Sequence, residues 1–141
     1  CVAGCCAHMV GFAVASWRDN RFQGLAAQGL GTSMLQIPNL MRKPVLWLPA
    51  VAASLVGGPL ATCVLHLEQN GFSIASGMGT CGLVGPIGVI VGWVNGDGAT
   101  AWDIVGLILV AVVVPALVSW AVSELMRRRG LIKPGDYKLD L

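Results

Sequence analysis

Charged residues are scarce in this chain, and long apolar runs separate them. Residues 45–67 and 104–126 are 23-residue runs of this kind, and a helix of that length crosses about 30 Å of hydrocarbon. Only 11% of the chain is charged, its mean hydropathy is +0.74, and soluble proteins carry about 25% charged residues. So few charges cannot cover a water-facing surface. The sequence therefore predicts an all-α, polytopic integral membrane protein.

The first apolar run, residues 1–17, opens the chain without a Met, and no charged region precedes it. It also lacks a small-residue cleavage site, so we do not expect a signal peptide. We interpret it as the remainder of a membrane helix and the chain as the C-terminal part of a larger protein. The predicted domains are a transmembrane transport domain over residues 1–126 and a cytoplasmic tail over residues 127–141.

The five cysteines lie in apolar or glycine-rich sequence without a Cys-x-x-Cys motif. We interpret them as small apolar residues, with a disulfide or a metal site as the alternative. We predict no metal site and no cofactor. The five cysteines are Cys1, Cys5, Cys6, Cys63 and Cys81.

A glycine-threonine phrase occurs twice in the chain. GLGTSMLQIP (residues 29–38) returns as GMGTCGLVGP (residues 77–86), with both glycines, the threonine, a leucine and the proline identical. Glycine permits a break in a helix and proline prevents its continuation. We therefore predict two re-entrant, glycine-rich hairpins, one in residues 22–41 and one in residues 72–94. A full membrane crossing by residues 72–94 is the alternative.

The distribution of charge supports opposite orientations for the two hairpins. Lys and Arg gather on cytoplasmic flanks, and two such hairpins place every basic residue on the cytoplasmic side, together with the C-terminus. Glu68, Asp97 and Asp103 then lie outside. Helix, hairpin, helix, inverted hairpin and helix form a probable inverted repeat with about three spanning helices. Transporters built from inverted repeats bind substrate near the midplane, between broken helices.

The glycines of the two repeated phrases can have two compatible roles. They can allow close helix packing, and they can expose peptide groups to a ligand. Nucleotide binding is disfavoured, because Gly-x-Gly-Thr lacks the Lys and the preceding strand of a phosphate loop. We predict no nucleic-acid partner.

Uncharged polar residues concentrate around the first phrase. Gln28, Thr32, Gln36 and Asn39 are spaced by four, four and three residues, which places them on one helix face. Amides and hydroxyls both donate and accept hydrogen bonds without charge, which suits a neutral polyol such as a sugar. Hydrogen bonding between helices is the alternative. These four residues, together with Ser33 and Thr80, are candidate substrate-binding residues.

His66 and Glu68 end a long apolar run, and ionisable groups within membranes are functional candidates. They could bind a sugar hydroxyl or move a proton, or simply mark a helix end at the interface. Glu124 is expected to form an interfacial ion pair. The Arg127–Arg129 triplet is interpreted as a topology anchor, with contact to anionic lipid or a cytosolic partner as the alternative.

Three stretches carry a resemblance to a known family, namely GLAAQGLGTSMLQIPNLMRKPVLWLP, GPLATCVLHLE and SGMGTCGLVGPIG. Together they resemble the membrane-embedded IIC component of bacterial phosphotransferase-system sugar transporters, of the second IIC-type family. The resemblance covers roughly residues 11–126. It implies a multi-pass protein of the bacterial plasma membrane that binds and translocates a sugar, in contact with membrane lipid.

The resemblance also implies partners. A cytosolic IIB component, phosphorylated from phosphoenolpyruvate through a IIA component, passes phosphate to the entering sugar, while IIC carries no phosphorylated residue. We therefore assign no catalytic residue, and the chain acts as a sugar phosphotransferase only with that separate donor. Other IIC families place a carboxylate and a histidine near the sugar, and the nearest candidates are Glu68 and His66. A homodimer is compatible with the resemblance. The alternative functions are an ion-coupled secondary transporter and a membrane sensor or scaffold that transports nothing.

Overall fold

A computed structural model of the chain describes residues 1–66, 73–96, 98 and 100–139. Helices form all the regular secondary structure in these residues. The α-helices are α1 (Val2–Ala15), α2 (Trp17–Ala26), α3 (Ile37–Arg42), α4 (Leu48–Pro59), α5 (Ala75–Met78), α6 (Val84–Asn95), α7 (Ala101–Ile108) and α8 (Val114–Arg128). Short π or 3-10 turns are η1 (Ala27–Gly31), η2 (Ser33–Gln36), η3 (Pro44–Trp47), η4 (Leu60–Val64), η5 (Cys81–Leu83) and η6 (Leu109–Val113).

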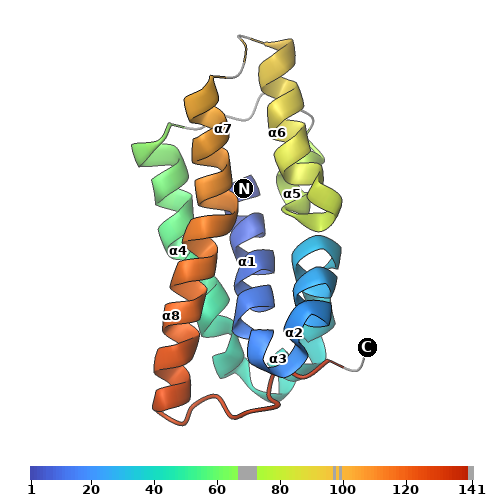
Figure 1. The fold of residues 1–141 in the computed structure, drawn as a ribbon, viewed down its shortest axis with the longest axis vertical. Helices are drawn as coiled ribbons and strands as arrows, with labels where there is room; N and C mark the ends of the chain where they lie inside the picture. Colours follow the sequence, from blue (N-terminus) through green and yellow to red (C-terminus); the bar gives the residue numbers. More distant parts are fainter. Residues whose placement is uncertain (67–72, 97, 99, 140–141) are drawn as a thin grey trace.

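Helix α1 lies at the centre of the molecule, with α4 and α8, which also contact each other, on one side and α2, α5 and α6 on the other (Figure 1). Helices α1, α4 and α8 approach closely, because a methyl group on Gly11 would lie 3.2 Å from Cα of Ala50 on α4. The Ser119 hydroxyl of α8 donates a 2.7 Å hydrogen bond to the Gly11 carbonyl. Small residues in contact let helix backbones pack tightly, so α1, α4 and α8 form the core.

Two continuous helices are long and apolar enough to cross a membrane, Pro44–Val64 with 21 residues and Ala101–Arg128 with 28. Both remain helical beside an internal proline, Pro59 or Pro115, where a π-type turn adjoins the proline. Helix α1, with 14 residues, is shorter than the roughly 20 residues that a crossing needs. The described chain thus has two helices of membrane length, whereas the sequence predicts about three.

The long helices expose apolar side chains. Leu55 and Leu117 are 70% and 62% exposed. Trp102 and Trp120 are also exposed, and 18 residues of helix separate them by about 27 Å. Tryptophans favour the two faces of a membrane, so their spacing matches one bilayer.

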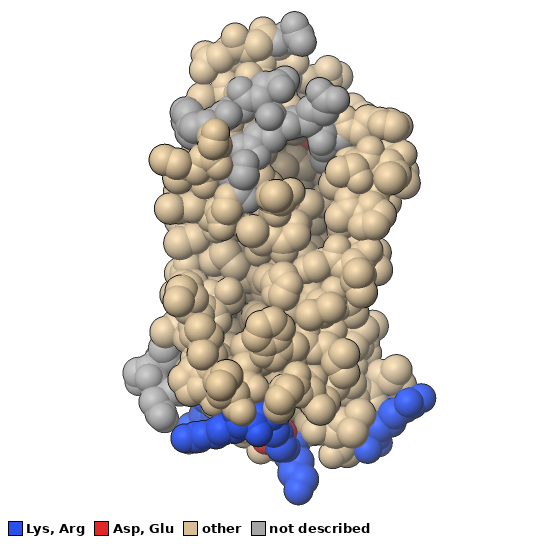
Figure 2. Space-filling view, turned by 180° about the vertical axis from the view of Figure 1, so that it is seen from behind, with Lys and Arg blue, Asp and Glu red and all other residues tan. Residues whose placement is uncertain are grey.

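Basic side chains gather at one end of the molecule (Figure 2). That end contains the turn between α1 and α2, the α3–η3 junction, and the end of α8 (Figure 1). Ion pairs link its elements, including Arg18 with Glu124 at 3.0 Å. The predicted ion pair of Glu124 is therefore confirmed.

Residues 17–42 do not form one helix. Arg21 has φ +48°, which interrupts α2, and Thr32 is extended, with φ −150° and ψ 138°. The Thr32 hydroxyl accepts a hydrogen bond from the Met34 N–H at 3.2 Å, a local bond that competes with helix continuation. The prediction that Gln28 and Gln36 share a helix face is wrong, because the chain breaks between them.

The second phrase builds the same succession of local structures as the first. In each, a helical turn ends near a glycine, a threonine follows, and a 3-10 turn leads into an α-helix with proline in its first turn. Thr32 precedes η2 and Thr80 precedes η5. Helices α2 and α3 occupy the basic half of the molecule, and α5 and α6 occupy the opposite half (Figure 1).

Candidate functional site

The two glycine-threonine phrases meet in space. The Thr80 hydroxyl donates a 2.6 Å hydrogen bond to the Gly29 carbonyl, and Thr80 is only 4% exposed. Residues 51 positions apart are joined at this point. We call it the phrase junction, defined by Gln28, Gly29, Gly79 and Thr80.

Gly79 places the second phrase directly against α1. Its φ is +56°, and a methyl group there would approach the backbone of Cys5 and Cys6 to 2.8 and 2.9 Å. Only glycine combines this backbone conformation with the available space. The phrase junction therefore rests on the central helix.

Gln28 is completely buried beside the junction. Its amide nitrogen donates to the Ser16 hydroxyl at 2.8 Å, and that hydroxyl donates to the Ala13 carbonyl at 3.2 Å. In the described part of the chain, the Gln28 amide oxygen has no hydrogen-bond partner. An unpaired buried acceptor costs about 1–3 kcal/mol, so the site holds a free acceptor that a ligand donor could satisfy.

The other candidate residues that the structure describes lie on different elements. Thr32 and Ser33 are partly buried at the start of η2. His66 is exposed at the far end of the η4 helix, with φ +48°. Glu68 lies outside the described residues. The structure therefore joins Thr80 to Gly29, the residue that follows Gln28, whereas His66 lies on a different element, after η4.

Gln36 and Asn39 bind the C-terminal segment. The Gln36 amide donates to the Tyr137 carbonyl at 3.0 Å, and the Asn39 amide donates to the Lys138 carbonyl at 3.0 Å and to the Gln36 amide oxygen at 2.9 Å. Their role in binding substrate stays a prediction, and in the structure their amide groups bind the backbone carbonyls of Tyr137 and Lys138.

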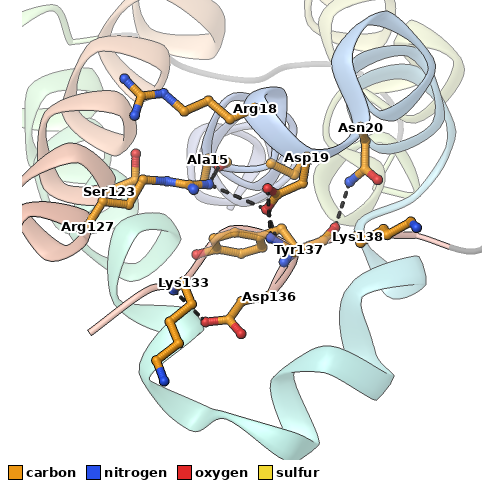
Figure 3. A network of polar contacts seen from close by, with 12 residues as sticks. Ala15, Arg18, Asp19, Asn20, Ser123, Arg127, Lys133, Asp136, Tyr137 and Lys138 are labelled. Carbon is orange, nitrogen blue, oxygen red and sulfur yellow. Dashed lines mark hydrogen bonds and ion pairs between the residues drawn. The ribbon is translucent and has the colours of Figure 1, made fainter. Parts of the chain in front are cut away.

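Residues 131–139, which we call the tail segment, are folded against the basic end (Figure 3). A turn over Lys133–Asp136 starts it, with Gly135 at φ +94° and the Asp136 N–H bonded to the Lys133 carbonyl. Pro followed by Gly at the centre is typical of a type II turn. Ile132 and Tyr137 are buried in one cluster with Leu46. The tail segment is thus part of the packed structure.

Two groups in the tail segment have shifted pKa values. Burial by itself raises the pKa of Asp136, but hydrogen bonds from the Lys43 ammonium and the Lys133 N–H, with the two lysine charges, bring it below its usual value. Burial raises the pKa of Tyr137, and the nearby Asp19 and Asp136 add to this against the opposing charge of Arg127. Both groups keep the charge state in which their hydrogen bonds form.

Sequence reasoning missed Ser16, Asp19 and Tyr137. The Pro-Gly turn signal before Tyr137 could have indicated that the tail segment folds back. Arg127 also has a packed position that the sequence did not indicate, because it donates to the Ala15 carbonyl at 3.1 Å and is largely buried.

Among the described residues, no three His, Cys, Asp or Glu side chains converge to hold a metal ion. The described residues form an all-helical structure with two apolar helices of membrane length and one basic end, which are features of helical membrane proteins.

The model of a known family, described as "Phosphotransferase system, EIIC", matches residues 1–139. The chain therefore belongs to this family and is an integral membrane component of a phosphotransferase-system sugar transporter, which works with cytosolic IIA and IIB components. No curated protein and no solved structure matches the chain.

Proposed function

We propose that this chain binds its sugar at the phrase junction and passes it across the membrane while IIB phosphorylates it. The proposal depends above all on one observation, the unpaired amide oxygen of the fully buried Gln28. In the next residue of the chain, the Gly29 carbonyl accepts a hydrogen bond from the Thr80 hydroxyl. One sugar hydroxyl can donate a hydrogen bond to the Gln28 amide oxygen. Another can replace either partner in the hydrogen bond between the Thr80 hydroxyl and the Gly29 carbonyl.

The polar side chains of the junction, together with Ser16 that Gln28 contacts, indicate a neutral solute. Gln28, Ser16 and Thr80 carry amide or hydroxyl groups, and burial of a charged ligand among them would cost far more than burial of a hydroxyl. A sugar or a similar polyol fits this chemistry. A sugar hydroxyl is also the group that can receive a phosphoryl group from IIB.

The arrangement of the two segments supports entry from opposite sides. Residues 17–42 lie in the basic half and residues 73–95 in the other half (Figure 1), and the two phrases share one succession of local structures. We infer two re-entrant hairpins related as an inverted repeat, with the basic end and the C-terminus in the cytoplasm. Irregular backbone at membrane depth is stable when it is buried in protein, as Gly79 is against α1.

Uptake of labelled sugars by membrane vesicles tests the proposal, with phosphoenolpyruvate and the cytosolic components inside. Gln28→Leu and Thr80→Val each remove a polar group while keeping much of the side-chain volume. We expect each to lower phosphoenolpyruvate-dependent uptake about tenfold or more, since one lost hydrogen bond to a ligand costs about 1–3 kcal/mol.

Two matched controls lie outside the junction. Gln23→Leu changes an exposed glutamine, and Thr62→Val changes an exposed threonine that bonds within its own helix. Both should keep wild-type uptake. Unchanged uptake in Gln28→Leu and Thr80→Val would contradict the site. Uptake driven by an ion gradient alone would indicate a secondary transporter, and binding without accumulation would indicate a sensor.

A further inference from the structure

The tail segment binds both limbs of the broken segment 17–42. On the first limb, the Asn20 amide donates to the Tyr137 carbonyl at 2.6 Å, and its oxygen accepts from the Leu139 N–H at 2.8 Å. On the second limb, the Gln36 and Asn39 amides donate to two consecutive tail carbonyls. One short stretch of backbone therefore bridges two limbs that the break at Thr32 separates.

Asp19 fixes the tail segment to the start of the first limb. Its carboxylate accepts hydrogen bonds from the N–H groups of Gly135 at 3.0 Å and Tyr137 at 3.2 Å, and from the Arg127 guanidinium at 3.5 Å (Figure 3). The Asp19 and Arg127 side chains are only 5% and 11% exposed. A buried carboxylate needs such partners, so the tail segment is needed to satisfy Asp19.

Tyr137 fixes the tail segment to the second limb and the start of the long helix Pro44–Val64. Its ring is fully buried, and its hydroxyl donates to the Leu46 carbonyl at 2.9 Å. The Lys43 ammonium binds the Asp136 carboxylate at 2.7 Å. The tail segment thus bonds to α2, η2, α3 and η3 at the basic end.

From these contacts we propose that the tail segment is a strap that positions the phrase junction, with Tyr137 as its anchor. The limbs that it joins meet at Thr32, three residues after Gly29, so their spacing sets where Gly29 lies against Thr80. While the strap is bound, the Thr80 hydroxyl stays on Gly29 and is shielded. When the strap is released, the limbs separate and the junction opens. Tyr137 therefore acts on the site through the limbs, as a positioning residue.

The strap makes a prediction that does not depend on the sugar, although its consequence for transport rests on the proposed function. In full-length protein whose native cysteines are replaced by alanine, Thr80→Cys reports opening of the junction through its reaction rate with a water-soluble maleimide. We expect Tyr137→Ala to raise this rate on the order of tenfold, as a shift in the population of the open state would. Tyr137→Phe, which loses only the hydroxyl, should give a smaller increase.

Two controls make each outcome decisive. Leu131→Ala, at an exposed position of the tail segment, should leave the Thr80→Cys rate unchanged. Ala53→Cys, fully buried on α4, reports opening of the core and should stay protected in Tyr137→Ala. An unchanged Thr80→Cys rate in both Tyr137 variants overturns the strap. So does parallel labelling of Ala53→Cys, since Tyr137 would then support the core in general. If Gln28→Leu leaves uptake unchanged while Tyr137→Ala gives the expected labelling pattern, the sugar site is contradicted and the strap is supported.

Discussion

At the scale of single residues, the Asp136 carboxylate stabilises both the turn that contains it and the contact of that turn with the α3–η3 junction. It accepts the Lys133 N–H at 2.8 Å, which closes the turn, and it binds the Lys43 ammonium, which ties the turn to the α3–η3 junction. Both interactions require the ionised carboxylate. Its pKa, lowered by these partners against the effect of burial, expresses that requirement.

Acid should loosen the tail segment through Asp136. Because the pKa of this carboxyl is lower in the folded protein than in the free chain, the stabilisation is complete above the ordinary value of about 4 and is lost as the pH falls through the folded value. Hydrogen exchange of the tail amides, corrected for the intrinsic effect of pH, measures this. We expect protection to decrease below about pH 4 in the wild-type protein.

Asp136→Asn supplies the comparison for this titration. The amide cannot titrate in this range and pairs weakly with Lys43, so the variant should show lower protection that is flat across the same pH interval. A full acid-dependent decrease in Asp136→Asn would show that another group controls the tail segment.

Gln36 and Asn39 show what residue patterns predict and what they do not. Their spacing from Gln28 describes a helix face, but the face does not exist, because Thr32 is extended. Uncharged amides at membrane depth do signal that partners are needed. The partners are carbonyls about 100 positions away, and no local periodicity encodes such a distance. The full burial of Gln28 follows from the packing of η1 on α1, which its position in the sequence does not encode.

At the scale of elements, the second phrase depends on Gly79. Its left-handed backbone turns the chain from α5 toward η5, and the Gly79 carbonyl accepts the Gly85 N–H at 2.9 Å. The position that a Cβ atom of residue 79 would occupy faces the backbone of α1. Gly77, in the same phrase, has no atom within 4 Å of where a methyl group would lie. The two glycines of one phrase therefore differ in what they contribute.

Gly79→Ala should destabilise the protein while Gly77→Ala should not. Alanine at position 79 adopts an unfavourable backbone conformation, which costs about 1–3 kcal/mol, and it overlaps α1. Gly77→Ala should change stability by no more than about 0.5 kcal/mol. Thermal melting of detergent-solubilised protein, followed by size-exclusion chromatography, compares them. Equal melting curves for the two variants would mean that the second phrase does not rest on α1.

The long elements were predictable because their physical cause is local. Apolar length alone places a helix over residues 45–67 and another over residues 104–126, and the structure has them at Pro44–Val64 and Ala101–Arg128. The start of the latter is set by a capping box of Thr100 and Asp103, three residues before the apolar run begins. The fold of the tail segment was not predictable from charge and hydropathy, because it depends on side chains from three distant elements.

At the scale of the whole molecule, the basic end and the opposite end differ in charge, and the two broken segments occupy one half each (Figures 1 and 2). If the basic end is cytoplasmic, residues 17–42 leave and return to the cytoplasmic side. Arg21 and Arg42, exposed at the two ends of this segment, should then face the same compartment. Ala101, exposed at the start of α7, should face the other.

Cysteine labelling in cells tests this topology. In a chain whose native cysteines are replaced, Ala101→Cys should react with a membrane-impermeant maleimide in intact cells. Arg21→Cys and Arg42→Cys should react only after permeabilisation, because both flank a segment that does not cross. Labelling of Arg21→Cys and Arg42→Cys from opposite sides would show a full crossing, and labelling of Arg42→Cys and Ala101→Cys from the same side would remove the inverted arrangement altogether. Either result would contradict two hairpins that enter the membrane from opposite sides. The hydrogen bond between Thr80 and Gly29 would then lose its proposed role.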